Sequence, residues 1–293
     1  MSVPGTTAGR RSLPPARRGG ADGGRRTVPN LLALVFVVTA GFPLYWMVNT
    51  AFKPARDALG PEPKFLPAAP TLENFRDALE VGDFWGSVGR SATVAGATVG
   101  IGLVVGLLAA VAVSRFAFRG RRAVIVAVLA VQMVPLVAMI IPVFLLLNEI
   151  GQIDRITGLV LTYLTFVLPF TVWTLRGFIV NIPKELEEAA MVDGCTRTGA
   201  FLRVVLPLLA PGLVATSIYA LVQAWNEYLY AMLIMSQDNQ TATVWLGNFV
   251  TSRGTDYAPM MAGSTLMALP VVVFFLIVQR KVAAGLTSGA VKG

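Results

Sequence analysis

Six long uncharged stretches separate the charged residues of this 293-residue chain. They are 20 to 26 residues long, hold 142 residues together, and lie at 27–52, 91–114, 123–148, 156–175, 204–226 and 257–279. A helix needs about 20 apolar residues to cross the hydrocarbon core of a bilayer. The stretches are apolar all round, whereas strands of a membrane barrel alternate between apolar and polar residues. The pattern predicts an all-α integral membrane protein with six transmembrane helices.

The composition excludes several classes of protein. Only 14% of the residues are charged, against about 25% in typical soluble domains. The chain has no histidine and a single cysteine, Cys195, so it lacks the commonest general base and any cysteine cluster for zinc or iron–sulfur groups. We therefore expect no enzyme activity, no cofactor and no metal site.

The basic residues indicate the orientation of the chain. With a cytosolic N-terminus, the cytosolic segments carry 17 of the 24 Lys and Arg residues, and the outer segments carry 7. Because cytoplasmic loops are enriched in Lys and Arg, we expect a multi-pass protein of the cell (inner or cytoplasmic) membrane with both termini in the cytosol. This bias accounts for the net charge of +8 without a nucleic-acid partner.

The chain divides into three regions. Residues 1–29 form an arm rich in Pro, Gly and Arg, which we expect to be disordered and cytosolic. The apolar run that follows has no small-residue cleavage site, so it is interpreted as a retained helix and not as a signal peptide. Residues 30–280 form the six-helix transmembrane domain, and residues 281–293 form a cytosolic tail.

A cytosolic loop at 181–206 has the pattern of two short helices. Asn181 is a candidate cap with Pro183 in the first turn, and Gly194 is suited to a left-handed helix end. A second amphipathic piece, Thr196–Leu206, places apolar residues opposite Arg197 and Arg203. These helices are too short to enclose a core, so the loop either lies at the membrane surface as a plain amphipathic segment or docks into a partner.

The same loop resembles the EAA loop of ABC importer permeases. The resemblance rests on residues at matching spacing: Glu188, Ala189, Ala190, Asp193, Gly194, Leu206 and Pro207. In that family the loop is a coupling helix seated in a cleft of the cytosolic ATPase, so the resemblance implies that these residues couple the chain to an ATPase. Two positions depart from the family pattern: Cys195 stands where alanine is usual, and Val204 where isoleucine is usual.

Further segments resemble the MalG-like permease subunits of binding-protein-dependent ABC carbohydrate importers. They are PLYWMVNTAFKP at 43–54, WNEYLYAML at 225–233 and GLTSGAVKG at 285–293. The resemblance implies the type I ABC importer permease fold and three kinds of partner: a second permease subunit in a heterodimer, a cytosolic ATPase dimer and an extracytoplasmic sugar-binding protein. It also implies that the tail reaches the ATPase through Gly285, Leu286, Thr287, Ser288 and Gly289.

One acidic residue, Glu227, falls within a predicted span. A carboxylate in lipid is costly, so it is expected to face a cavity or a hydrogen-bond partner. Two interpretations remain open: Glu227 lines the substrate path together with Trp225, Asn226 and Tyr228, or it holds two helices together. Other membrane aromatics offer stacking faces for sugars or simply anchor and pack; they are Tyr45, Trp46, Tyr163, Trp173 and Tyr230.

Glycines in the second span form two GxxxG patterns, which indicate close helix packing. They are Gly96, Gly100, Gly102 and Gly106. The outer loop at 237–258 is polar, and in MalG-like subunits the corresponding loop can enter the sugar cleft of the binding protein. By that resemblance, the contacting residues are Ser252, Arg253, Gly254, Thr255, Asp256 and Tyr257.

The sequence therefore predicts a permease subunit of an ABC importer that moves a sugar or oligosaccharide into the cytoplasm. No GxxxxGK[ST] phosphate loop occurs in the chain, so ATP hydrolysis belongs to separate ATPase subunits. A polyol or a glycerol phosphate remains an alternative substrate, although the spans contain no basic residue that would suit a phosphate. Two alternatives from other classes are a secondary transporter and a membrane scaffold without transport activity.

Overall fold

The computed structural model describes residues 27–252 and 254–290, with side chains described from 28 to 277 apart from 253. The predicted arm at 1–29 therefore lies almost wholly outside the described residues. The helices are α1 Thr27–Ala51, α2 Ala55–Ala58, α3 Glu73–Glu80, α4 Phe84–Arg115, α5 Arg121–Val131, α6 Ile140–Glu149, α7 Ile156–Val180, α8 Glu185–Val192, α9 Arg197–Ala200, α10 Leu206–Leu208, α11 Ala210–Asn226, α12 Leu229–Ile234, α13 Ala242–Trp245 and α14 Tyr257–Ala290.

Shorter elements connect these helices. They are the 3₁₀ turns η1 Leu136–Met139, η3 Gln237–Asn239 and η4 Leu246–Phe249, the π-helical turn η2 Phe201–Val205, and the strands β1 Val250–Thr251 and β2 Gly254–Thr255. The two strands pair antiparallel as a small hairpin. The hairpin is a local addition to the all-helical architecture that the sequence predicts.

Four described helices are long and apolar enough to cross a membrane: α1, α4, α7 and α14. Two further spans consist of bent pairs: α5 with η1–α6, bent by 97°, and α9–α10 with α11, bent by 68°. Counting each pair as one span gives the predicted six. The first bend lies beside Pro135, whose ring removes a backbone N–H and disfavours helix at the preceding residue.

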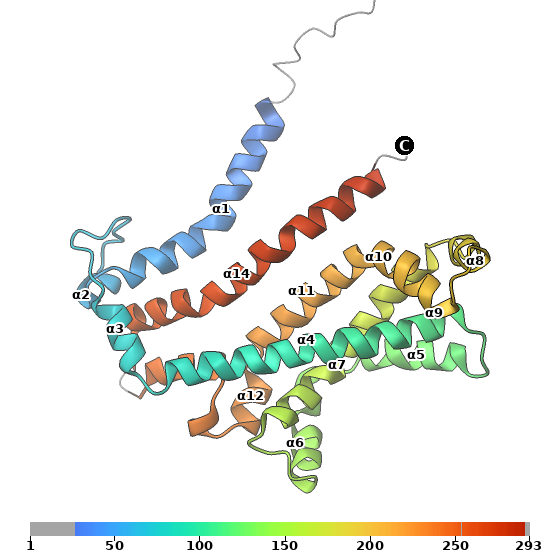
Figure 1. Ribbon diagram of the computed structural model, residues 1–293. Coiled ribbons are helices and arrows are strands. Elements are labelled where there is room, and N and C mark those ends of the chain that lie inside the picture. Colours follow the sequence, from blue (N-terminus) through green and yellow to red (C-terminus); the bar gives the residue numbers. More distant parts are fainter. Residues whose placement is uncertain (1–26, 253, 291–293) are drawn as a thin grey trace, which may run out of the picture. The chain divides into compact units, whose positions relative to one another are not determined.

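The chain separates into two units, residues 1–46 and 47–293. The part of α1 in the first unit is apolar and contains ring contacts from Phe42 to Tyr45 and Trp46, with centroids 6.4 and 5.9 Å apart. In the second unit, α4 packs along α7 and α11 (Figure 1). Its core comprises three buried clusters: one between α4, α7 and α11, a second around Trp245, and a third at the Arg115 end of α4.

Two glycines of α4 allow α7 to approach closely. A Cβ at Gly102 would lie 3.1 Å from Val167, and one at Gly106 would lie 2.5 Å from the Cγ2 of Thr171. The predicted close packing is therefore confirmed for this pair. Gly96 and Gly100 make no such contact within the described chain, because a Cβ at either position would meet nothing within 4 Å.

This contrast predicts different effects for the same substitution. Gly106→Ala forces the Thr171 side chain and the α7 backbone to shift, so we expect it to lower the free energy of unfolding by about 1–3 kcal/mol. Gly100→Ala gains helix propensity without a clash, so we expect an unchanged or slightly higher stability. Thermal unfolding of the two variants in the same detergent measures the difference, and equal melting temperatures would contradict the packing.

Candidate coupling loop and solute cavity

The first helix of the 181–206 loop begins later than the sequence suggests. Asn181 does not cap it: its side chain donates to the carbonyl of Gly177 (3.0 Å) at the end of α7. Helix α8 starts at Glu185, after Lys184. A proline disfavours the helical conformation at the residue before it, and Ile182 precedes Pro183. Ile182 is also buried in the cluster at the Arg115 end of α4. The chain therefore turns at Ile182 before a new helix begins.

The predicted helix end at Gly194 is confirmed. Its φ is +92°, and the N–H of Cys195 donates to the carbonyl of Ala190 (3.0 Å), so the chain reverses after α8. The hydroxyl of Thr196 then accepts from the N–H of Gly199 (3.1 Å) and caps α9. A left-handed residue followed immediately by a capped helix fixes the angle between the two short helices.

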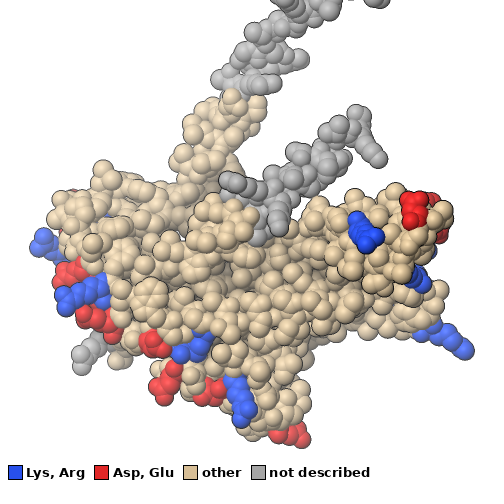
Figure 2. Space-filling model, viewed as in Figure 1, with Lys and Arg blue, Asp and Glu red and all other residues tan. Residues whose placement is uncertain are grey.

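Helix α8 buries none of its residues. Leu186, Met191 and Val192 are exposed, Val192 by 87%. Figure 2 shows acidic side chains at the end of the second unit where α8 lies. By contrast, the second half of the loop is anchored: Val205 and Leu209 are fully buried against α4 and α7. A solvent-facing helix with exposed apolar residues on a fixed base has the character of a docking surface.

Glu227 lies at the end of α11, where its carboxylate accepts three hydrogen bonds. The donors are the hydroxyl of Tyr163 on α7 (2.9 Å) and the N–H groups of Tyr230 (2.9 Å) and Ala231 (3.0 Å) in the first turn of α12. This geometry matches the second interpretation from the sequence, a carboxylate that holds helices together. Its neighbour Trp225 is buried, whereas Asn226 and Tyr228 are exposed.

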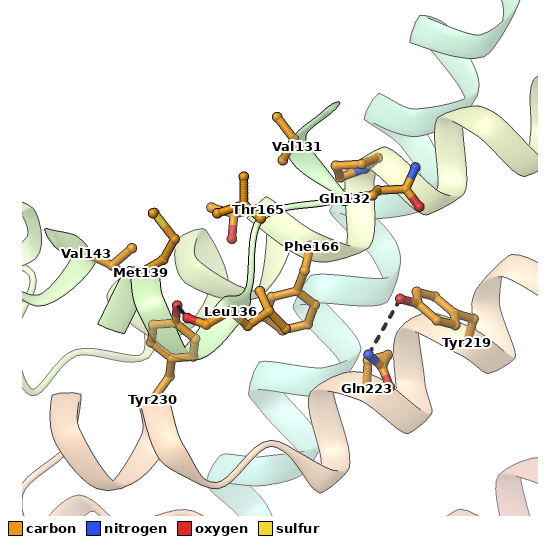
Figure 3. Close-up of a pocket in the computed structure, with 12 residues that line it drawn as sticks. Val131, Gln132, Leu136, Met139, Val143, Thr165, Phe166, Tyr219, Gln223 and Tyr230 are labelled. Carbon is orange, nitrogen blue, oxygen red and sulfur yellow. Dashed lines mark hydrogen bonds between the residues drawn. The ribbon is translucent and has the colours of Figure 1, made fainter. Parts of the chain in front are cut away.

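A cavity of about 390 Å³ opens where the α5–η1–α6 span bends away from α7 and α11 (Figure 3). Its described lining contains no charged side chain; the polar residues among it are Gln132, Thr165, Tyr219, Gln223 and Tyr230. Tyr219 and Gln223 are 3.5 Å apart between Oη and Nε2. The ring of Phe166 adds an apolar wall.

Sequence reasoning identified only Tyr230 of these cavity residues. Its hydroxyl donates to the carbonyl of Leu136 (2.8 Å) in the bent span. One available signal was the four-residue spacing of Tyr219 and Gln223, which places both on one helix face. The cavity itself depends on the 97° bend, whose direction no local pattern specifies.

The hairpin formed by β1 and β2 carries the residues predicted to enter a binding protein. Thr251 pairs with Gly254 and Val250 with Thr255, and Ser252 directly follows the first strand. Arg253 lies outside the described residues. The predicted tail contacts at 285–289 fall within α14, and their side chains are also outside the described ones.

A family model described as the inner membrane component of binding-protein-dependent transport systems matches residues 102–287. This stretch covers more than half of the chain. The chain belongs to this family. The permease is accordingly a membrane component of a transport system.

Curated relatives span nearly the whole permease. It is 42% identical over 269 residues to the diacetylchitobiose uptake system permease protein DasC of Streptomyces coelicolor, covering 92% of this chain and 98% of the relative. It is 37% identical over 272 residues to the trehalose transport system permease protein SugB of Mycobacterium tuberculosis, with 92% and 98% covered.

Solved structures share the fold of the permease. A bacterial ABC transporter that imports the acidic polysaccharide alginate matches with a TM-score of 0.73 at 20% identity, covering 86% of this chain and 94% of that one. The alginate transporter in complex with a pentasaccharide-bound periplasmic protein matches with a TM-score of 0.63 at 18% identity, covering 87% and 93%. At these identities the likeness establishes the type I importer permease fold.

Asp154 joins the α6–α7 loop to the segment that follows α12. Its carboxylate accepts from the N–H of Ser236 (2.9 Å) and from the side chain of Asn239 (3.0 Å), while its own N–H donates to Ile234 (2.9 Å). These bonds, led by that from Ser236, hold the pKa of Asp154 below its ordinary value. Its φ of +56° is a conformation that Asp tolerates better than most residues.

Proposed function

We propose that this permease is the MalG-like half of an ABC importer that brings a neutral sugar or oligosaccharide into the cytoplasm. A second permease subunit completes the membrane pathway, a cytosolic ATPase dimer supplies the energy, and an extracytoplasmic binding protein delivers the saccharide. Relatives named for diacetylchitobiose, trehalose and arabino-oligosaccharide transport support the substrate class.

The observation that carries this proposal is α8, a helix without a buried residue on an anchored base. In the proposed orientation α8 faces the cytosol and seats in the ATPase through Glu188, Ala189 and Ala190. The ATP-bound ATPase must then bind the outward-facing permease more tightly than the inward-facing one, because an energy source shifts states only through differential affinity. The tail at 285–289 adds a second ATPase contact in this proposal.

The cavity supports a neutral substrate. Its polar groups are amides and hydroxyls, which can donate to and accept from sugar hydroxyls, and its aromatic rings can stack on the apolar faces of sugars. A glycerol phosphate would call for Arg or Lys at the site, and the described cavity lining has neither. A secondary transporter is disfavoured because the Glu227 carboxylate is occupied by three donors and no second acid within the predicted spans completes a relay.

Uptake in cells that lack the chromosomal gene tests the proposal. We expect the wild-type gene to restore ATP-dependent uptake of a labelled neutral saccharide, with diacetylchitobiose and trehalose as the first probes. An ionophore that dissipates the proton gradient should leave the initial rate unchanged while ATP is maintained. Restored uptake of labelled glycerol phosphate alone, or uptake abolished by the ionophore, would contradict the proposal.

The same assay tests the cavity. Gln223→Leu removes a hydrogen-bonding group of the lining at similar volume, so we expect a KM for uptake about two- to tenfold higher at unchanged expression. Asn226→Leu is the matched comparison, because it removes another side-chain amide about one turn along α11. The Asn226 side chain lies outside the cavity and donates to the carbonyl of Val222 (2.9 Å). A higher KM in Asn226→Leu alone would favour the path near Glu227 over this cavity.

A further inference from the structure

The end of α4 contacts both helices of the 181–206 loop. Arg115, its last residue, places Nε 2.7 Å from Oε1 of Glu187 on α8, and its guanidinium donates to the carbonyl of Ile182 (3.0 Å). The next residue, Phe116, lies under the guanidinium of Arg197, the first residue of α9, at 4.6 Å. Two successive residues thus hold the two short helices at once.

The contact between Arg115 and Glu187 is sheltered from water. The side chains are only 8% and 15% exposed, so their attraction is screened less than that of a surface pair. The nearest atoms are not aligned as a hydrogen bond, and the contact is therefore an electrostatic one. Glu188, the next residue, is exposed, as expected for successive helical positions that face different sides.

The other end of α4 is joined to the outer loop. Arg90 donates through Nε to the carbonyl of Gln240 (3.0 Å), and the hydroxyl of Ser91 accepts from the N–H of Ala242 (2.8 Å). Gln240, Thr241 and Ala242 are buried. This segment leads through α13 and η4 to the β1–β2 hairpin.

Between these joints α4 is continuous. It has 32 residues, about 48 Å at 1.5 Å per residue, and contains no proline, whereas α7 and α14 carry Pro169 and Pro270. Sharp helix kinks occur at proline, at Gly/Ser pairs or at π-bulges; α4 contains glycines and serines, yet it forms one uninterrupted helix over its 32 residues. An unbroken helix fixed at both ends moves as one body, so displacement of one end displaces the other.

We propose that α4 transmits movement between the 181–206 loop, which docks the ATPase, and the outer loop at 237–258. Arg115 is the positioning residue that holds α8 against α4, and we call this role of α4 the rod. The proposal rests on the coupling role proposed above. In this arrangement Glu188 and its neighbours face the ATPase, Glu187 faces α4, and movement of α8 reaches Gln240–Ala242 through the helix axis. Arg115 acts through α4 and does not itself touch the ATPase.

A fluorescent label on the outer loop tests the rod. The label is attached at Ser252→Cys in a Cys195→Ala background, within the purified complex of both permeases and the ATPase dimer, and its response to MgATP with vanadate is measured. We expect Arg115→Gln and Glu187→Gln each to reduce the response about fivefold, with the double variant no worse than either single one. The ATPase should still copurify with all of them.

Three further variants sharpen the test. Arg119→Gln removes an exposed cation just beyond α4 and should leave the response unchanged. Ser91→Ala should reduce it, because it breaks the outer joint. The swap Arg115→Glu with Glu187→Arg should restore part of it. An undiminished response in Arg115→Gln, an additive double variant, or loss of the ATPase from these variants would overturn the rod. Failure of the wild-type chain to retain any ATPase would instead overturn the coupling function on which it rests.

Discussion

In a permease that carries Gly194→Val, the ATPase should be lost from the purified complex. Gly194 adopts a φ of +92°, a conformation in which a β-branched residue costs about 1–3 kcal/mol. The helix end would relax toward negative φ, which breaks the bond from Cys195 to Ala190 and changes the angle between α8 and α9. Because tenfold in affinity corresponds to about 1.4 kcal/mol, we expect at least about tenfold weaker retention of the ATPase.

A matched control carries the same strain elsewhere. Gly151 has a φ of +66°, and a Cβ added there would meet nothing within 4 Å, as at Gly194, but this glycine lies in the α6–α7 loop. Gly151→Val should destabilise its own loop and retain the ATPase. The measurement is the amount of ATPase that copurifies with Gly194→Val compared with Gly151→Val. Equal retention, or equal loss, would mean that the shape of the 181–206 loop does not govern docking.

Removal of the Glu227 carboxylate should have a comparably large effect on stability. Glu227→Ala leaves the Tyr163 hydroxyl and the N–H groups of Tyr230 and Ala231 without their acceptor. An unsatisfied buried group costs about 1–3 kcal/mol, and Tyr163 and Tyr230 are both buried. We expect the free energy of unfolding to fall by about 3 kcal/mol or more, with α12 separating from α7.

Two companion variants separate structure from transport at Glu227. Glu227→Gln keeps one carbonyl acceptor, so it should lie between wild type and Glu227→Ala in thermal stability. Glu149→Ala removes an exposed acid at the end of α6 and should be neutral. If Glu227→Gln folded with wild-type stability yet transported nothing, the carboxylate would act directly on transport. Its bonds between helices would then not explain the loss of uptake.

The membrane architecture followed from the sequence because its cause is local. Charged residues cannot lie in lipid cheaply, so uncharged stretches mark spans regardless of how the helices pack. The left-handed end at Gly194 was predictable for the same reason: the residue type and its position after a helix suffice. The misplaced cap at Asn181 shows the limit, since the burial of Ile182 against α4 and α7 overrides the local capping preference.

Contacts between residues far apart in the chain could not be predicted from the sequence. Arg115 and Glu187 are separated by two spans in the sequence, and only the packing of α4 against α7 brings them together. The cavity beside Tyr219 and Gln223 likewise depends on how far the α5–η1–α6 span bends, and Pro135 indicates a break without its direction. Glu227 was noticed for its charge, and two of its donors, the N–H groups of Tyr230 and Ala231, are local in the sequence; only the fold places the third donor, the Tyr163 hydroxyl of α7, beside it.

Copurification from native membranes is the most direct test of the central claim that this permease couples to an ATPase through α8. A tagged wild-type chain should bring down a second permease and an ATPase from detergent extract, while Glu188→Lys should keep the second permease and lose the ATPase. Gly151→Val and Arg119→Gln serve as retained controls. A wild-type chain that purifies alone, or an ATPase retained equally by Glu188→Lys, would contradict the account.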